Sequence, residues 1–387
     1  MAKDQPDEVS PERFEVSRRR FLRTAGVTAA AVPFAGFLAD TLMDMPANAS
    51  TRERVAAGRR AARNSVFESA YAPHPPYRFT FVNHVTTNPF FVPTRYGYAD
   101  AAALLGGITV AWEGSTTSDV GQMIAAFDAA IAARVNGIAS TIIADTSFEA
   151  PTNKALASGI PVVAYNADGN ELNKADVAAN HFMSYVGQGL YDAGVAAGNK
   201  ILESVKKGDL VAGFIATPGA LNIQPRINGA QSVLKPAGIN FQVVPTGALL
   251  SQEATAVEAW YLAHKDVKFM YAVDAGSTSS AAAVVLKYNL KGKVFVGGFD
   301  FLTTTVKAIA NGSQLWTIDQ QPYLQGFLPV LQLFQYNVSG GLVAPANTDT
   351  GLKFVYKPQI GPYTKADRYE GSSAKPVTLT PPKTITV

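Results

Sequence analysis

Regular alternation between two kinds of segment constrains the fold of this chain more than any other feature. From residue 77, short apolar runs typical of strands alternate with longer amphipathic segments typical of helices. Five apolar runs lie between residues 78 and 187, and five more lie between residues 209 and 320. Alternation at this spacing predicts parallel sheets with helices on both faces. Two consecutive series predict an α/β protein of two similar doubly wound lobes.

The chain is expected to pass between these lobes three times. We assign residues 77–187 and 321–340 to an N-terminal lobe, and residues 188–320 and 350–360 to a C-terminal lobe. The crossings then fall near Gly187, near Gln320 and between about Ser339 and Lys353, and such segments can form a three-segment hinge. Residues 50–76 are interpreted as a solvated lead-in, and residues 361–387 as a tail.

The N-terminus carries a targeting signal. The sequence SRRRFLR at residues 17–23 resembles the twin-arginine export motif, and a mildly apolar run follows at residues 25–38. This run is shorter than the ~20 residues of a membrane helix. ANA at residues 47–49 supplies small residues for cleavage before Ser50. Residues 1–49 are therefore predicted to be a twin-arginine signal peptide, removed near Ala49, and the mature protein is predicted to be periplasmic.

Composition excludes several classes of site. The chain has no cysteine, which removes disulfides, thiol nucleophiles and thiolate metal ligands. Its net charge of +3 is too small to indicate a nucleic-acid partner. The four histidines show no metal-ligand spacing. We expect no metal and no cofactor.

Polar residues gather where the predicted strands end. In open α/β sheets, ligands bind beyond the carboxyl ends of the strands, and two facing lobes would bring these ends across one cleft. Carboxylates, amides, an arginine fork and aromatic faces together suit a neutral ligand with many hydroxyl groups. The polar residues collected by this rule are Asn83, Asn88, Asp145, Asn166, Asp168, Asp274, Asp300, Asp319 and Gln320.

The sequence TTNPFF at residues 86–91 follows the first strand directly. Asn88 is a good helix N-cap and Pro89 suits the first helical position. Adjacent side chains point in different directions, so one core face cannot easily bury both Phe90 and Phe91. The alternatives are that the rings pack under neighbouring loops or that they face a ligand.

Six ordered motifs across roughly residues 77–358 resemble the ribose/galactose-type periplasmic binding proteins of sugar importers. They are TNPFF at 87–91, GIPVVAYN at 159–166, PRINGA at 225–230, YAVD at 271–274, GGFD at 297–300 and TIDQQPY at 317–323. The resemblance implies a monomeric solute-binding subunit of an ABC importer that binds a monosaccharide or sugar alcohol, closes about its hinge and delivers the ligand to a membrane permease.

The resemblance also implies roles for particular residues. Phe90 and Phe91 would sandwich the ligand, and Gln320 would bind near the hinge. Hydrogen bonds would come from both lobes, through Asn88, Asn166, Arg226, Asp274 and Asp300. Ribose-type members have Asp-Arg where this chain has Asn166-Ala167, and Asn at the position of Asp274. Relative to ribose-type members, an acid of the first lobe is replaced by an amide, and an amide of the second lobe is replaced by an acid. This exchange favours another pentose, a hexose or an acyclic polyol over ribose.

Other interpretations remain open at this point. Asp300 could cap the following helix, and Arg226 could pair with a surface acid. Asp274 and Asp300 could form a glycosidase pair, although no nucleophile elbow, phosphate loop or dinucleotide fingerprint is present. A repressor of the same fold would carry a helix-turn-helix in place of the export signal. A periplasmic sensor that presents its ligand to a receptor is not distinguished from a transport subunit.

Overall fold

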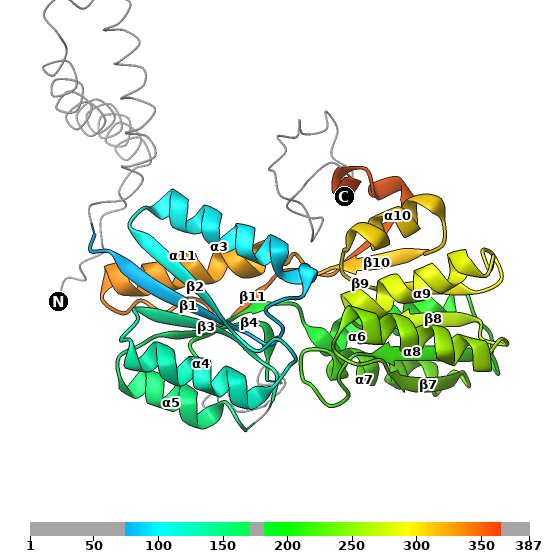
Figure 1. Cartoon of the computed structure of the whole chain (residues 1–387), viewed down its shortest axis with the longest axis horizontal. Coiled ribbons are helices and arrows are strands. Elements are labelled where there is room, and N and C mark those ends of the chain that lie inside the picture. Colours follow the sequence, from blue (N-terminus) through cyan, green and yellow to red (C-terminus); the bar gives the residue numbers. More distant parts are fainter. Residues whose placement is uncertain (1–73, 145, 170–181, 365–387) are drawn as a thin grey trace, which may run out of the picture. The chain divides into compact units, whose positions relative to one another are not determined.

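A computed structural model describes residues 74–144, 146–169 and 182–364, and its architecture rests on two six-stranded sheets (Figure 1). In the first sheet the strand order is β11-β5-β4-β3-β1-β2, and all neighbouring strands are parallel. Its strands are β1 (Tyr77–Asn83), β2 (Ile108–Gly114), β3 (Gly137–Ile142), β4 (Val162–Asp168), β5 (Ser184–Gly187) and β11 (Asn347–Asp349).

The second sheet repeats the order of the first. Its order is β12-β10-β9-β8-β6-β7, with β12 antiparallel to β10 and the other pairs parallel. Its strands are β6 (Leu210–Ile215), β7 (Asn240–Pro245), β8 (Phe269–Ala272), β9 (Phe295–Phe299), β10 (Trp316–Asp319) and β12 (Lys353–Tyr356). The prediction of an α/β protein with two similar parallel-sheet lobes is therefore confirmed.

Helices cover both faces of each sheet (Figure 1). In the first lobe, α11 packs on β3, β4 and β5, whereas α4 packs on β1 and β2. Among the described residues, no helix has the length and apolar character needed to cross a bilayer. The helices are η1 (Pro89–Phe91), α3 (Val92–Leu105), α4 (Val120–Ala132), α5 (Glu149–Ala157), α6 (Leu190–Leu202), α7 (Gln224–Leu234), α8 (Leu250–Ala263), α9 (Ala275–Lys287), α10 (Thr303–Asn311), α11 (Leu324–Ser339), η4 (Lys357–Gln359) and η5 (Pro362–Thr364).

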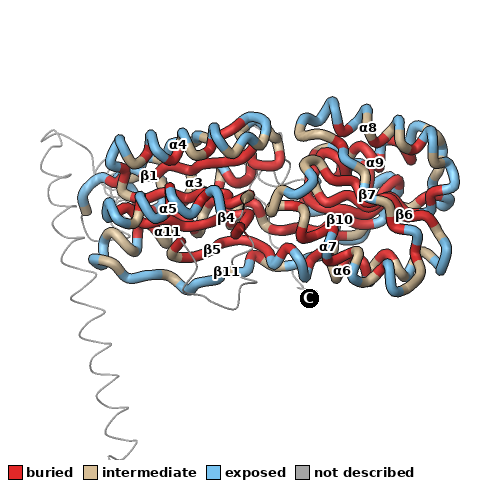
Figure 2. Tube along the Cα trace, turned by 90° about the horizontal axis from the view of Figure 1, so that it is seen from below, coloured by how far each residue is buried: buried red, intermediate tan, exposed pale blue. Residues whose placement is uncertain are grey.

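The central strands are buried on both faces, which explains their continuous apolar sequences. Every residue of β3, β4, β6 and β8 is buried, and Figure 2 shows these strands inside a shell of more exposed helices. The edge strand β2 instead alternates between half-buried and exposed residues. Separate apolar clusters fill the two faces of the second sheet, one around Phe269 and Trp316 and the other around Phe214 and Val257.

Hydrogen bonds join the three segments that pass between the sheets. Thr350 donates its backbone N–H to Gly187 O at 2.9 Å and its hydroxyl to Gln320 O at 2.7 Å. Gln188 Nε2 donates to Gly351 O at 2.9 Å. The strand β11, which the sequence did not predict, extends the first sheet, so the third crossing is shorter than residues 339–353.

Several sequence predictions fall outside the described residues. The signal peptide, most of the lead-in, Asp145 and residues 365–387 lie there. The first residues assigned to the tail are described, and they pack on the second lobe. Tyr363 is buried, stacks on Phe301 with ring centroids 4.2 Å apart and donates its hydroxyl to Asp319 Oδ2 at 2.9 Å.

Candidate functional site

A narrow cavity of about 50 Å³ lies where the carboxyl ends of the two sheets meet. All eight residues that the sequence analysis proposed as ligand contacts line it: Asn88, Phe90, Phe91, Asn166, Arg226, Asp274, Asp300 and Gln320. Four further residues complete the lining, namely His84, Asn222, Ile223 and Ala275. The structure thus brings together side chains from both lobes that are up to 236 positions apart, from His84 to Gln320.

Asn88 and the two phenylalanines form one wall of the cavity. Asn88 caps the short helix η1, since its Oδ1 accepts the Phe90 N–H at 2.9 Å, as its sequence context predicts. Both rings are buried and meet edge to face, with centroids 4.7 Å apart. A ligand between two rings needs van der Waals contact on both sides, which requires a separation of about 7–8 Å. In this arrangement the pair forms a single wall, and contact of both rings with a ligand stays a prediction.

Arg226 reaches the cavity from α7 and is only 2% exposed. Its guanidinium donates to Val273 O at 2.9 Å and to Gln188 Oε1 at 3.3 Å, and its Cζ lies 4.0 Å from the centroid of the Phe299 ring. Its Nε is buried without a hydrogen-bond partner. Burial lowers the pKa of Arg226, and the charge of Asp300 opposes this shift. The side chain pairs with no surface acid among the described residues, and these two hydrogen bonds use only two of its five N–H groups.

Asp300, Gln320 and Asn166 form a connected row of polar groups. Gln320 Nε2 donates to Asp300 Oδ1 at 2.6 Å, and Asn166 Nδ2 donates to Gln320 Oε1 at 3.3 Å and to Gln325 Oε1 at 3.1 Å. Burial raises the pKa of Asp300 to about 7, although Arg226 and the hydrogen bond from Gln320 favour its charged form. Asp300 does not cap the next helix, because α10 begins after Leu302 without a side-chain cap.

Asp274 closes the second-lobe side of the cavity and also caps α9. Its Oδ1 accepts the Ser277 N–H at 2.8 Å, and its Oδ2 accepts the Ala216 N–H at 3.0 Å. Burial raises the pKa of Asp274, and these donors act in the opposite direction. The carboxylate is therefore fixed in place before any ligand arrives.

His84 and Asn222 are site residues that the sequence analysis missed. Asn222 Nδ2 lies 3.0 Å from His84 Nε2, and His84 Nδ1 lies 3.2 Å from Thr141 Oγ1. Because the amide donates to Nε2, the imidazole proton lies on Nδ1 and is donated to Thr141. Burial lowers the pKa of His84 to about 3 and keeps the ring neutral. The strand-end rule could have found His84, which directly follows Asn83, whereas Asn222 lies in a turn without a sequence signal.

Some strand-end residues serve the fold and do not line the cavity. Asn83 donates to the Tyr165 hydroxyl at 2.9 Å and accepts the Val85 N–H. Asp319 accepts from Gln321 and Tyr363. Asp168 is buried at the end of β4 but outside the cavity lining. The carboxyl-end rule therefore selects the edge of each sheet at which the cavity lies, but not which of its side chains line the cavity.

A second, wider hollow of about 460 Å³ lies at the opposite ends of the first-sheet strands. Arg134, Asn136, Ser158 and Asn337 are its polar lining residues, and neither an acid nor an aromatic ring contributes to it. Asn337 Nδ2 is already bound to Asn136 O at 2.9 Å. Convergent charged and aromatic groups favour the smaller cavity as the ligand site despite its size.

The residues that line the smaller cavity, around Phe90 and Arg226, can bind hydroxyl groups, and they lack the features of a metal site. Carboxylates accept from hydroxyls, the guanidinium donates to them, and the phenylalanine wall covers the C–H surface of a ring. Within residues 74–144, 146–169 and 182–364, no group of three or more His, Asp or Glu side chains could hold a metal ion.

Comparison with known proteins identifies one family. Residues 79–340 match the periplasmic binding protein domain family. The xylose/arabinose-binding protein XylF of Sulfolobus acidocaldarius is 47% identical over 316 residues, which cover 79% of this chain and 78% of the relative.

Solved structures agree with this match. A carbohydrate transporter of Acidothermus cellulolyticus in complex with myo-inositol is 26% identical, with a TM-score of 0.66 over 75% of this chain and 98% of that chain. A solute-binding protein of Burkholderia graminis in complex with D-arabinose is 24% identical, with a TM-score of 0.67 over 75% of this chain and 99% of that chain. At 24% identity, the likeness to the Burkholderia graminis protein concerns the fold alone.

Proposed function

Because this chain belongs to the periplasmic binding protein family, we propose that it is the solute-binding subunit of an ABC-type carbohydrate importer. The observation that carries the proposal is the cavity, where two acids, one arginine, four amides and two phenylalanine rings converge from both lobes. Such a set binds hydroxyl groups and the C–H face of a sugar ring. The ligand is a monosaccharide or sugar alcohol, and the relative XylF points first to the pentoses xylose and arabinose.

Binding requires contacts from both lobes. Asn88, Phe90 and Asn166 belong to the first lobe, whereas Arg226 and Asp300 belong to the second. A ligand that touches both sets favours the closed arrangement over an open one. Motion about the three joined crossings, followed by delivery to a membrane permease, completes the transport role.

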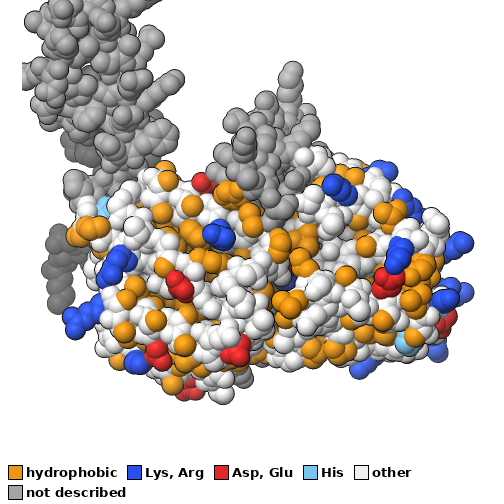
Figure 3. Space-filling view, in the orientation of Figure 1, with side chains coloured by type: hydrophobic (Ala, Val, Ile, Leu, Met, Phe, Trp, Pro, Cys, Tyr) orange, Lys and Arg blue, Asp and Glu red, His pale blue; other side chains and the backbone are white. Residues whose placement is uncertain are grey.

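The family is a solute-binding family, and turnover is not expected. The acids of the cavity are held by backbone and amide donors, and no nucleophile–base pair lines the cavity. On the face seen in Figure 3, basic and acidic side chains are interspersed without a broad basic patch, consistent with a small-molecule ligand.

The family implies an exported, periplasmic protein, and the twin-arginine motif indicates export in the folded state. Replacing Arg18 and Arg19 by lysine should leave the precursor inside the cell, as measured by fractionation and immunoblotting. Normal export of this variant would exclude the twin-arginine route.

A thermal-shift screen of the full chain against pentoses, hexoses and polyols tests the proposed function. A ligand that binds only the folded state raises the melting temperature in a concentration-dependent way. We expect one or a few sugars to do so, and chromatography should recover the bound sugar unchanged. The absence of any shift across the screen, or steady release of a product, would contradict the proposal.

A further inference from the structure

Glu253 is a buried acid that the proposed site does not yet include. It lies in the first turn of α8 and is only 2% exposed. No ion pair of the described residues involves it, and its Oε2 has no hydrogen-bond donor. An ionised carboxylate in this position would be uncompensated, which is costly in a protein interior.

The glutamate occupies a space built for it beside the candidate site. Helices α8 and α9 pack together, and Gly276 in the first turn of α9 faces Glu253. A Cβ at Gly276 would lie only 1.4 Å from Glu253 Oε2, so the glycine leaves the space that the carboxyl group fills. Asp274 caps the same turn, two residues before Gly276, and in addition to burial its charge and hydrogen bond raise the pKa of Glu253.

The two carboxyl groups differ in the donors around them. Asp274 accepts backbone N–H groups from Ser277 and Ala216, which favours its ionised form. Glu253 has no such support; burial first, and then the charge of Asp274 and the hydrogen bond to it, raise the pKa of Glu253 to about 10. A single proton between them therefore resides on Glu253.

We propose that Glu253 is a positioning residue whose protonated carboxyl group donates a hydrogen bond to Asp274 and holds that carboxylate ready for the hydroxyl groups of the ligand. This inference rests on the proposed function for its consequence, sugar binding. Asp274 then has donors from Ala216, which directly follows β6, from α9 and from α8, and its approach to the cavity is set without a second negative charge.

The protonation state can be tested without any ligand. An infrared difference spectrum at pH 7 between the full wild-type chain and Glu253→Gln should show a carboxylic-acid C=O band that the variant lacks. The inference is overturned if that band is absent from the wild type. It is also overturned if the band persists in Glu253→Gln and is lost in Asp274→Asn.

Two substitutions of Glu253 by side chains of similar size distinguish a role in positioning Asp274 from a role in packing alone. Glutamine retains a donor to Asp274, whereas methionine fills the same space without one. By calorimetry with D-xylose and L-arabinose, Glu253→Gln should bind within about twofold of the wild type, and Glu253→Met about fivefold or more weakly. Melting temperatures measured in parallel report packing.

Unchanged affinity in Glu253→Met, or equal loss in both variants, would show a purely structural role and overturn the inference. If the wild type binds no sugar in the wider screen, the proposed function fails, while the infrared result still decides the protonation of Glu253.

Discussion

Asp300 and Asn166 both occupy the left-handed region of backbone conformation, with φ of +74° and +64°. Among residues with a side chain, Asn and Asp adopt this region most readily. Asp300 directly follows β9, Asn166 lies two residues before the end of β4, and both line the cavity. Backbone conformation and ligand chemistry therefore select the same two residue types. Alanine would add strain at these positions, so Asn is the better substitute for Asp300.

We predict that Asp300→Asn weakens sugar binding about fivefold. A hydrogen bond to a charged group contributes about 1 kcal/mol more than a neutral one, and 1.4 kcal/mol corresponds to a tenfold change. Calorimetry at pH 8, above the pKa of about 7, measures the difference.

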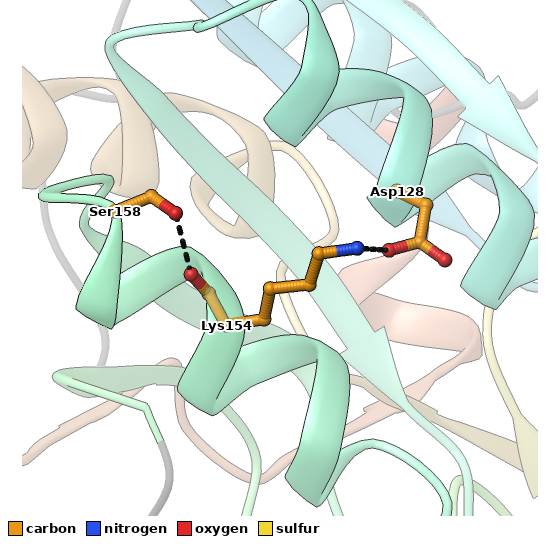
Figure 4. A network of polar contacts seen from close by, with 3 residues as sticks. All are labelled: Asp128, Lys154 and Ser158. Atoms are coloured by element: carbon orange, nitrogen blue, oxygen red, sulfur yellow. Dashed lines mark hydrogen bonds and ion pairs between the residues drawn. The ribbon is translucent and has the colours of Figure 1, made fainter.

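The matched control is Asp128→Asn, whose carboxylate pairs with Lys154 at 2.7 Å on the surface between α4 and α5 (Figure 4). Exposed ion pairs contribute little, so this variant should bind as the wild type does. Equal affinities of all three proteins would exclude Asp300 as a ligand contact.

Asp300 also predicts how the stability of the unliganded protein depends on pH. Its pKa is raised by burial from 3.8 to about 7, so the folded state retains a proton that the unfolded state has lost. The resulting stability is fully present below pH 4 and is lost as the pH rises toward 7. Urea unfolding across this range should show wild type losing stability relative to Asp300→Asn. If the free energy of unfolding depends on pH in the same way in the wild type and in Asp300→Asn, the raised pKa of Asp300 is contradicted.

The sequence predicted the residues of the site better than their arrangement. The cap at Asn88 and the strand-end acids follow from local rules that need no partner. The edge-to-face contact of Phe90 with Phe91 and the pairing of His84 with Asn222 depend on how distant segments pack. No pattern within one strand or turn encodes such contacts.

At the scale of elements, glycines set the position of the helix that carries Arg226. Helices α6 and α7 cross closely: a Cβ at Gly194 would lie 2.3 Å from Arg226 O, and a Cβ at Gly229 would lie 2.2 Å from Tyr191 O. The backbone atoms that line this crossing cannot rotate away as side chains can. The helix pair therefore fixes where the arginine enters the cavity.

We predict that Gly194→Ala destabilises the protein by about 1–3 kcal/mol, the usual cost of overpacking. The same displacement of α7 should move Arg226 and weaken sugar binding. Chemical denaturation and calorimetry measure the two effects. Gly361→Ala is the control, because a Cβ there meets no atom within 4 Å. A Gly194→Ala protein as stable as the control would contradict the close crossing.

Most elements could be predicted because their strands are buried and apolar over several residues. The strand β11 was missed because its three residues, Asn347–Asp349, form no apolar run. It is a strand only because β5 offers a free edge, with Thr348 opposite Val186. The strand was missed because its pairing with β5 depends on the tertiary structure, which the sequence of this segment does not reveal.

At the scale of the whole molecule, direct hydrogen bonds join the lobes at the cavity. Leu221 donates its backbone N–H to Ile143 O at 2.9 Å, beside the contact of His84 with Asn222. These bonds belong to a closed arrangement, and the sugar adds further contacts that favour it. We predict a smaller radius of gyration with bound sugar than without it, measured by solution X-ray scattering. Sugar binding at an unchanged radius would contradict closure.

The most direct test of sugar binding in the cavity is a crystal structure of the chain with the sugar found by the thermal-shift screen. We predict that the sugar lies against the wall formed by Phe90 and Phe91, with hydroxyl groups about 2.7–3.2 Å from polar atoms of Arg226 and Asp300. A sugar bound instead in the hollow near Arg134 and Asn337, or on the outer surface, would contradict the assignment.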